Sequence, residues 1–290
     1  MIPKILKWIV VVALVAAAIA LGANGVQKII AFHQHRAASA PAPEPRPALT
    51  VAYSRAASSF LPPNSPLWRR APALSVTLMA QVLVLPWGQG VTPSVEVSAI
   101  HDDRMIAFRL SWPDATRNAK LVRNDDRPDG AAIMFPIGQE TPSSIMMGFL
   151  RPANIWHWKA ARRHTDRPKV YIDFYNPNEA GTLLATHRED LIAALPGSEI
   201  IDNTATMPGT LTPKAIQKVA GRGIWENNRW LVTFSRPLTT TDEADSQFNL
   251  TSGNGAAFAI WDGEHHERGS RKSISDWVQL RFASREAGVQ

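Results

Sequence analysis

The sequence predicts an all-β fold, an antiparallel β-sandwich with few short helices, preceded by an N-terminal transmembrane helix. Three observations support this prediction. Apolar residues recur with a period of two from Ser75 onward, helical periodicity is scarce, and a long apolar run lies near the N-terminus. Gly, Pro, Asn and Asp separate many short segments, which is typical of sandwiches. The apolar fraction of 45% and the ten tryptophans exclude a disordered chain.

The first 36 residues have the pattern of a membrane-inserting segment. Lys4 and Lys7 precede an uninterrupted apolar run over residues 8–23. A helix that begins at Ile5 approaches the ~30 Å thickness of a bilayer core. Residues 1–36 are therefore predicted to be an uncleaved anchor, with a cleaved secretory signal as the alternative. The chain is then expected on the periplasmic face of the cytoplasmic membrane, or soluble in the periplasm after cleavage.

A proline-rich stretch separates this segment from the folded part. Ala37–Pro47 reads AASAPAPEPRP, a composition that favours an extended polyproline conformation. Residues 37–71 are predicted to be a tether, and residues 72–290 to form one β-sandwich domain of roughly 200 residues.

The clearest strand signals are two turns with alternating residues beside them. Apolar residues at 95–99 and 106–112 alternate with mostly polar ones, and His101–Arg104 joins the two runs into a hairpin. Asn227 and Asn228, which tolerate positive φ, form a turn before another strand at 230–234. Further strands are predicted at 75–85, 170–174, 258–260 and 278–282, and short helices at 187–195 and 213–220.

Composition narrows the chemistry. The absence of cysteine excludes disulfides, thiol catalysis, Cys-ligated iron–sulfur clusters and covalently attached c-type haem. The net charge of +6 raises the question of nucleic acid, but no Lys/Arg run with interleaved aromatic residues is present, so no nucleic-acid partner is expected. Hydrolase and phosphate-loop motifs are also missing.

Two charged clusters are predicted to be solvated surface features. Asp125, Asp126 and Asp129 with Gly130 suggest calcium, but their spacing lacks the ligand alternation of a calcium loop, so a solvated acidic turn is expected. The pair His265–His266, between two glutamates, is expected in a surface loop.

Two longer segments are more informative. Residues 142–160 read PSSIMMGFLRPANIWHWKA, and residues 258–277 read FAIWDGEHHERGSRKSISDW. Their residues alone indicate only methionines that fill a core and a lysine in solvent. His157, between two tryptophans, is consistent with a packed, hydrogen-bonded residue.

Together and in this order, these segments carry a resemblance. The chain resembles the haem b-binding γ subunits of exported molybdenum enzymes of the dimethyl sulfoxide reductase family, a group that includes γ subunits of ethylbenzene dehydrogenase, dimethylsulfide dehydrogenase, selenate reductase and chlorate reductase. The matching pieces are Met147–Gly148, Pro152–Ala160, Trp225 with Trp230–Leu238, Phe258–Glu264 and Arg268–Trp277.

The resemblance implies one non-covalent haem b between the two sheets, with a methionine and a lysine as axial ligands. Met147 falls at the family's Met-Gly position, and Lys272 at the lysine of its Arg-Gly-x-x-Lys-Ser stretch. Met146 is the alternative thioether, because adjacent strand residues face opposite sides, and Lys159 is the other possible amine. Only a neutral amine can bind iron, so the site must lower the pKa of Lys272.

The resemblance also implies the surroundings and role of the cofactor. Trp156 and His157 are expected to contact the haem, and Arg268 and Arg271 to pair with its propionates. Residues 176–220, an insertion, are expected to contact a partner or to cover the pocket mouth.

The implied function is electron transfer by a non-catalytic subunit. Its partners would be an iron–sulfur subunit and a molybdenum catalytic subunit on one side, and a periplasmic cytochrome or a membrane electron carrier on the other. A haem-free, exported carbohydrate- or ligand-binding sandwich, with tryptophans that stack on sugars, is the alternative.

Overall fold

A computed structural model describes the protein over residues 46–55, 57, 61–120, 126–138, 145, 152–161, 195–206, 210–251 and 254–285. These residues form fourteen strands and one short 3-10 helix, η1 (Pro66–Arg69). The predicted anchor at 1–36, the strand at 170–174 and nearly all of the helix at 187–195 lie outside the described residues. Within the described part, no helix has the length and apolar character needed to cross a bilayer.

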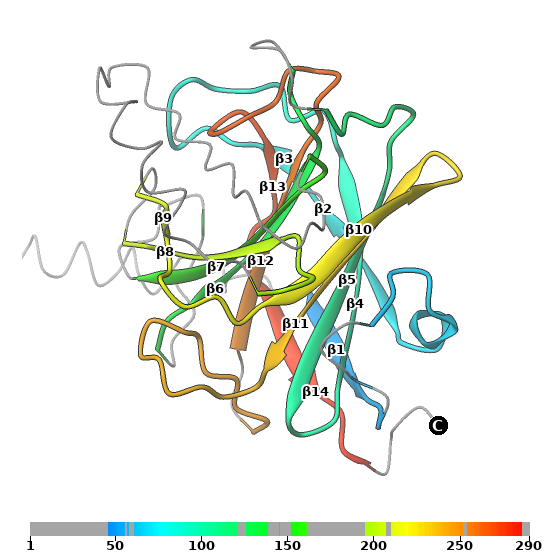
Figure 1. The fold of residues 1–290 in the computed structure, drawn as a ribbon, viewed down its shortest axis with the longest axis vertical. Coiled ribbons are helices and arrows are strands. Elements are labelled where there is room, and N and C mark those ends of the chain that lie inside the picture. Colours follow the sequence, from blue (N-terminus) through cyan, green and yellow to red (C-terminus); the bar gives the residue numbers. More distant parts are fainter. Residues whose placement is uncertain are drawn as a thin grey trace, which may run out of the picture. The chain divides into compact units, whose positions relative to one another are not determined.

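The strands hydrogen-bond in one continuous order that divides into two halves (Figure 1). We name the halves here by their strands. The first half runs β10 (Ala220–Glu226), β11 (Arg229–Pro237), β5 (Met105–Pro113), β4 (Ser94–His101), β1 (Ala48–Tyr53) and β14 (Val278–Phe282), with β2 (Ala73–Thr77) beside β4. The second half runs β12 (Asn254–Trp261), β6 (Gly130–Pro136), β7 (Ala153–Lys159), β8 (Ile200–Ala205) and β9 (Thr212–Pro213), with β13 (Ser273–Ile274) and β3 (Met79–Ala80) beyond β12.

The pairing is mostly antiparallel, as predicted, but the sheet is mixed. β1 pairs in parallel with both β4 and β14. This strand lies inside the stretch predicted to be a tether, so the sheet begins before Pro72. Leu49 and Val51 are almost completely buried, and this burial holds the strand between its two partners.

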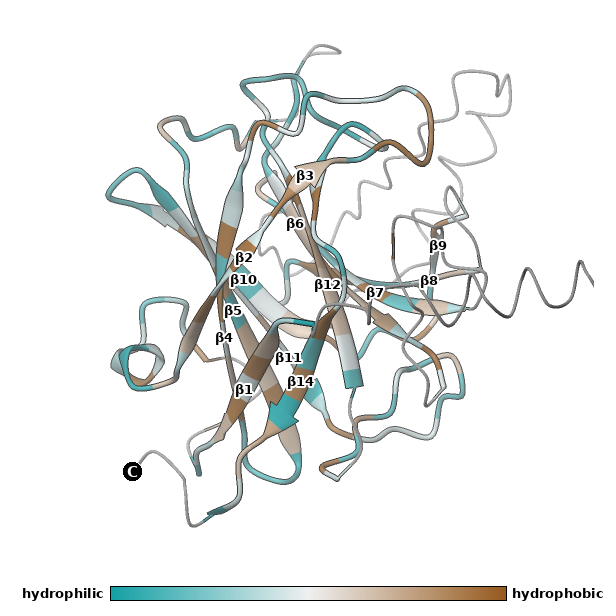
Figure 2. Ribbon diagram, turned by 180° about the vertical axis from the view of Figure 1, so that it is seen from behind, coloured by the Kyte–Doolittle hydropathy of each residue, from teal (hydrophilic) through white to brown (hydrophobic). Residues whose placement is uncertain are grey.

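The two halves face each other (Figure 2), and one core rich in aromatic residues lies between them. Ring centroids of Trp112 on β5 and Trp158 on β7 are 6.3 Å apart, and those of Trp158 and Trp230 on β11 are 4.8 Å apart. Phe108 contacts Trp156 in the same way at 6.0 Å. Because side chains alternate along a strand, every second residue of β6, β7 and β12 points into this core.

Both turn predictions are confirmed. Antiparallel β4 and β5 form the expected hairpin, with Asp103 at a φ of 70°. Asn227 and Asn228 join β10 to β11 at φ values of 50° and 56°. The helix predicted at 213–220 is wrong, because this segment ends β9 and starts β10, whose residues pair with β11.

Candidate functional site

The second half has a face that turns away from the core, and we call it the outer face. It carries the residues of β6, β7 and β12 that alternate with the core residues: Ala132, Met134, Ala153, Ile155, His157, Lys159, Ala257, Ala259 and Trp261. Across the strands, Ala259 pairs with Ala132, and Ala132 pairs with His157. Four of these residues are alanines, so the side chains in the middle of this face are short.

Lys272 lies at one edge of the outer face, immediately before β13. Its backbone carbonyl accepts a hydrogen bond from the Gln81 N–H at 3.0 Å. Its Nζ lies 4.8 Å from the ring centroid of Trp261. Within the described residues, Nζ has no ion pair or hydrogen bond, and burial lowers the pKa of Lys272 from 10.5 to about 8. At pH 7 roughly a tenth of this amine is therefore neutral, far more than for a lysine with an ordinary pKa.

Trp261 connects Lys272 to His157. The indole Nε1–H donates to the Gly269 carbonyl at 3.0 Å, which fixes the ring over Gly130. The ring centroids of Trp261 and His157 are 5.0 Å apart. The structure therefore brings two of the predicted site residues, His157 and Lys272, to the same indole.

A second apolar cluster lies on the same face, beside Trp277. It contains Trp277, Met134, Ala153, Ala205, Ala257 and Ile145, with Ile155 packed against it. The Ile145 N–H donates to Asp276 Oδ1 at 2.9 Å, which anchors the residue that directly precedes Met146. The buried Nε1–H of Trp277 has no acceptor among the described residues. A buried donor without a partner is rare and is consistent with a bound group.

Other predicted site residues have different positions. Trp156 is completely buried in the core and donates to Asn154 Oδ1 at 3.1 Å, so it points away from His157 and Lys272. Arg271 is exposed and Arg268 is half-buried, both in the turn before Lys272. Met146 and Met147 lie outside the described residues.

The described residues do not support the expected location between the two sheets. The space between the halves is filled by indole and phenyl rings in contact, including Phe135 and Trp156 at 4.6 Å between centroids. Lys272 and His157 lie on the opposite side of the same strands. The candidate site is therefore the outer face.

Comparison with known proteins identifies the family. A family model described as ethylbenzene dehydrogenase matches residues 65–273. The chain belongs to the ethylbenzene dehydrogenase family. The chlorate reductase subunit gamma of Ideonella dechloratans is 26% identical over 81% of this chain and 83% of the relative. The dimethylsulfide dehydrogenase subunit gamma of Rhodovulum sulfidophilum is 28% identical over 76% of each chain.

A third relative is named for a cofactor. A protein of Haloferax mediterranei, described as the heme subunit ORF7 of a respiratory nitrate reductase, is 26% identical over 76% of this chain and 67% of its own length. Solved structures are more distant. A carbohydrate binding module of family 9 from Caldicellulosiruptor kristjanssonii, in complex with cellotriose, shares 9% identity at a TM-score of 0.38, over 83% of this chain and 97% of that chain.

Sequence reasoning missed two residues of this face. Trp261 was noted only as part of the WDGE motif, and Trp277 only as the end of the last matching segment. The available signal was alternation. Ile260 belongs to the core, so its neighbour Trp261 must face outward with Lys272.

Proposed function

We propose that this chain is a non-catalytic electron-transfer subunit that carries one non-covalent haem b on the outer face. The observation that supports this most is the amine of Lys272, a partly buried residue, which has a pKa lowered to about 8 and no acidic partner among the described residues. A lysine with this environment is unsuited to a surface role and suited to donating its lone pair to a metal.

The donor set of this face fits a haem. The alanines present short side chains on this face, and the Trp277 N–H is a donor available to a carboxylate. Arg271, exposed in the turn before Lys272, is a second partner for a propionate. With cysteine absent, the group must be held without thioether links.

The second axial ligand is proposed to be Met147, with Met146 as the alternative. Ile145 is packed against Trp277 on the outer face, and the two methionines follow it directly in the chain. The residue directly before the two methionines therefore lies on the face that holds Lys272, which supports a thioether ligand from this part of the chain.

A bound haem supplies a one-electron iron couple, and with both axial positions occupied by side chains it has no open position for substrate. Lys272 must stay unprotonated to serve, and burial against Trp261 favours this state. The thioether favours reduced iron. These contributions of the chain suit electron transfer and not catalysis.

The proposed partners follow from the relatives, which are named as subunits of a nitrate reductase, a chlorate reductase and a dimethylsulfide dehydrogenase. We propose that this chain passes electrons between the iron–sulfur subunit of a molybdenum oxidoreductase and a periplasmic cytochrome or membrane carrier. Residues 1–36 would anchor it to the periplasmic face of the membrane. Cell fractionation with N-terminal sequencing of the mature chain distinguishes an anchor from a cleaved signal.

The test is the haem content and spectrum of the full chain after export in haem-sufficient cells. We expect one extractable haem b per chain and a low-spin spectrum in both oxidation states. A well-folded protein without haem would contradict the proposal, and polysaccharide binding by that protein would favour the carbohydrate-binding alternative.

A further inference from the structure

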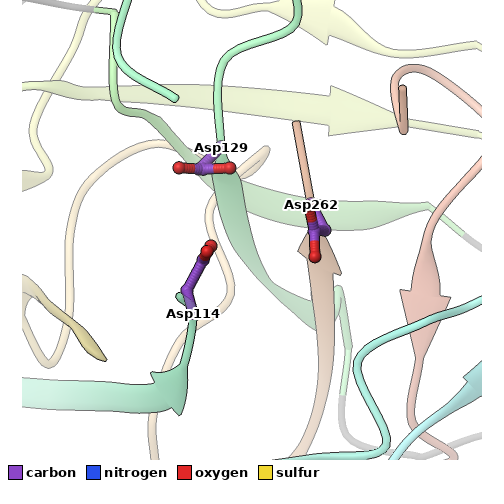
Figure 3. Close-up of side chains that lie close together, drawn as sticks. All are labelled: Asp114, Asp129 and Asp262. Carbon is purple, nitrogen blue, oxygen red and sulfur yellow. The ribbon is translucent and has the colours of Figure 1, made fainter. Parts of the chain in front are cut away.

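Three aspartates from distant parts of the sequence meet at one end of the strands (Figure 3). Asp114 directly follows β5, Asp129 directly precedes β6, and Asp262 directly follows β12. Each offers a carboxylate oxygen, and these oxygens all lie within 4.8 Å of one another. The cluster therefore joins the end of a strand in one half of the sandwich to two strands of the other half.

Asp129 is rigidly held and is not the solvated residue that the sequence predicts. Its side chain is completely buried. Oδ1 accepts the Gly263 N–H at 2.9 Å, and Oδ2 accepts the Asn118 N–H at 2.8 Å and the Trp230 Nε1–H at 2.9 Å. These three donors orient the carboxyl group and favour its ionised form, whereas burial and, to a lesser extent, the nearby Asp114 raise the pKa of Asp129 to about 7.

Asp114 provides an independent sign of a missing ligand. The residue is only 7% exposed. Its Oδ1 accepts the N–H and the hydroxyl of Thr116 at 3.0 and 3.2 Å. Its Oδ2 is buried and has no hydrogen-bond donor among the described residues, and the side chain points toward Asp129 (Figure 3). Leaving such an oxygen unpaired costs about 1–3 kcal/mol or more, because it is charged.

A second group of aspartates, Asp202, Asp242 and Asp245, is neutralised by basic side chains, unlike the cluster at Asp114. Lys214 pairs with Asp242 at 2.8 Å and with Asp202 at 3.4 Å, and Arg236 pairs with Asp245 at 2.9 Å. Among the described residues, the three clustered aspartates have no lysine or arginine partner.

In the part of the chain that the structure describes, the basic residue that pairs with the cluster is His265. Its Nδ1 lies 2.9 Å from Asp262 Oδ2, and its side chain is 52% exposed. A half-exposed histidine on the outer edge of the cluster cannot compensate two buried carboxylates.

We propose that Asp114, Asp129 and Asp262 bind a divalent cation of the Ca²⁺ type that ties β5 to β6 and β12. All three ligands are carboxylate oxygens, which hard cations prefer, and the imidazole of His265 is already engaged by Asp262. Two oxygens at the Ca²⁺ distance of 2.3–2.6 Å from one ion lie up to about 5 Å apart, which matches the cluster. The ion would supply the charge that Asp114 Oδ2 lacks.

Binding can be followed through Trp230, whose indole donates to Asp129. The full chain, freed of metals with a chelator, is titrated with Tb³⁺ while the indole is excited. We expect sensitised Tb³⁺ emission that Ca²⁺ competes away and an equal concentration of Mg²⁺ displaces less well. We also expect the Tm to rise when Ca²⁺ is added to the metal-free protein.

The matched variants are Asp114→Asn and Glu243→Gln. Both remove one negative charge, but Glu243 is exposed in the loop after β11 and takes no part in the cluster. Asp114→Asn should be as stable as wild type in chelator, because it removes a buried unpaired charge. It should bind the cation on the order of tenfold or more weakly, since ligand charge sets affinity in such sites. Glu243→Gln should bind like wild type.

Two results would contradict the proposed cation site. The first is that Tb³⁺ gives no sensitised emission and Ca²⁺ does not change the Tm. The second is that wild type and Asp114→Asn respond equally to both ions. Asp114→Asn could also be more stable than wild type in chelator and stay more stable after Ca²⁺ is added. That result would show that a bound proton, and not a metal ion, neutralises the negative charge of the cluster. If Asp114→Asn does not fold, Asp262→Asn at the half-buried position gives the same readout. The assay does not require haem, so its outcome is independent of the proposed function.

Discussion

The two faces of β6, β7 and β12 differ in how their side chains pack and in whether their polar atoms have hydrogen-bond partners. On the inner face, large rings contact one another, and the two indoles of β7 have partners: Trp156 Nε1 donates to Asn154 Oδ1 at 3.1 Å and Trp158 Nε1 to Glu199 Oε2 at 2.7 Å. On the outer face, alanines replace rings, Lys272 faces an indole, and the Trp277 N–H has no acceptor among the described residues. The inner face therefore stabilises the fold, and the outer face is consistent with the binding of a ligand.

The largest expected effect is on the inner face. Trp158→Ala removes the ring packed between Trp112 and Trp230, and a Gly223 Cβ position only 2.2 Å from that ring shows how tightly it fits. We expect a loss of about 3–5 kcal/mol in the free energy of unfolding, measured by urea denaturation. Trp87→Ala, at a residue 60% exposed, should change it by less than about 0.5 kcal/mol. Similar losses would contradict the assignment of the core.

Neighbouring alanines on β6 test the two faces directly. Ala131 faces the core between Trp158 and Ile260, whereas Ala132 faces outward between His157 and Ala259. Ala131→Leu should overpack the core and cost about 1–3 kcal/mol in stability. Ala132→Leu should reduce haem loading, measured by haem content per chain, which Ala131→Leu should not do in the fraction that folds. Full loading of Ala132→Leu would place the cofactor elsewhere.

The buried amine makes the haem-free protein sensitive to pH. Because burial lowers the pKa of Lys272 from 10.5 to about 8, the unfolded chain binds more protons between these values. The free energy of unfolding should therefore rise as pH increases from about 8 to 10.5, by about 1–3 kcal/mol. Lys272→Met should remove this rise in urea unfolding at pH values below and above the window. Lys120→Met, at an exposed site, should keep it.

The smallest effect is expected at the exposed turn before Lys272. Arg271→Ser should leave stability within about 0.5 kcal/mol, because Arg271 is exposed. It should weaken haem binding a few-fold if the guanidinium pairs with a propionate, as measured by haem transfer to an acceptor protein. Arg222→Ser, at an exposed position on β10, is the matched control. Equal haem transfer from both variants would remove Arg271 from the site.

Alternation predicted much of the fold but not its long-range order. The β4–β5 hairpin and the Asn227–Asn228 turn follow from local residue patterns. β1 was missed because its partners β4 and β14 are distant in sequence and pair in parallel, so no turn marks it. The segment 213–220 was misread as a helix because pairing with β11, and not local preference, determines where β10 begins.

For the two sites, too, local sequence predicted some residues, while long-range packing determined the rest. The resemblance predicted that Lys272 and His157 belong to one site. It could not predict that they lie on the outer face, because this depends on which of their neighbouring residues pack into the core. The described residues favour the outer face over the expected position between the sheets, because buried rings contact one another there. The aspartate cluster draws one residue from each of three segments, so its spacing along the chain carries no metal-binding signal.

The central claim is that Lys272 on the outer face binds the iron of a haem. Visible and electron paramagnetic resonance spectra of haem-loaded variants test it most directly, with Lys159→Ala as the control amine and Met146→Ala as the control thioether. We predict that Lys272→Ala and Met147→Ala each lose the wild-type low-spin spectrum while both controls retain it. An unchanged spectrum in Lys272→Ala, with the haem still bound, would contradict the account.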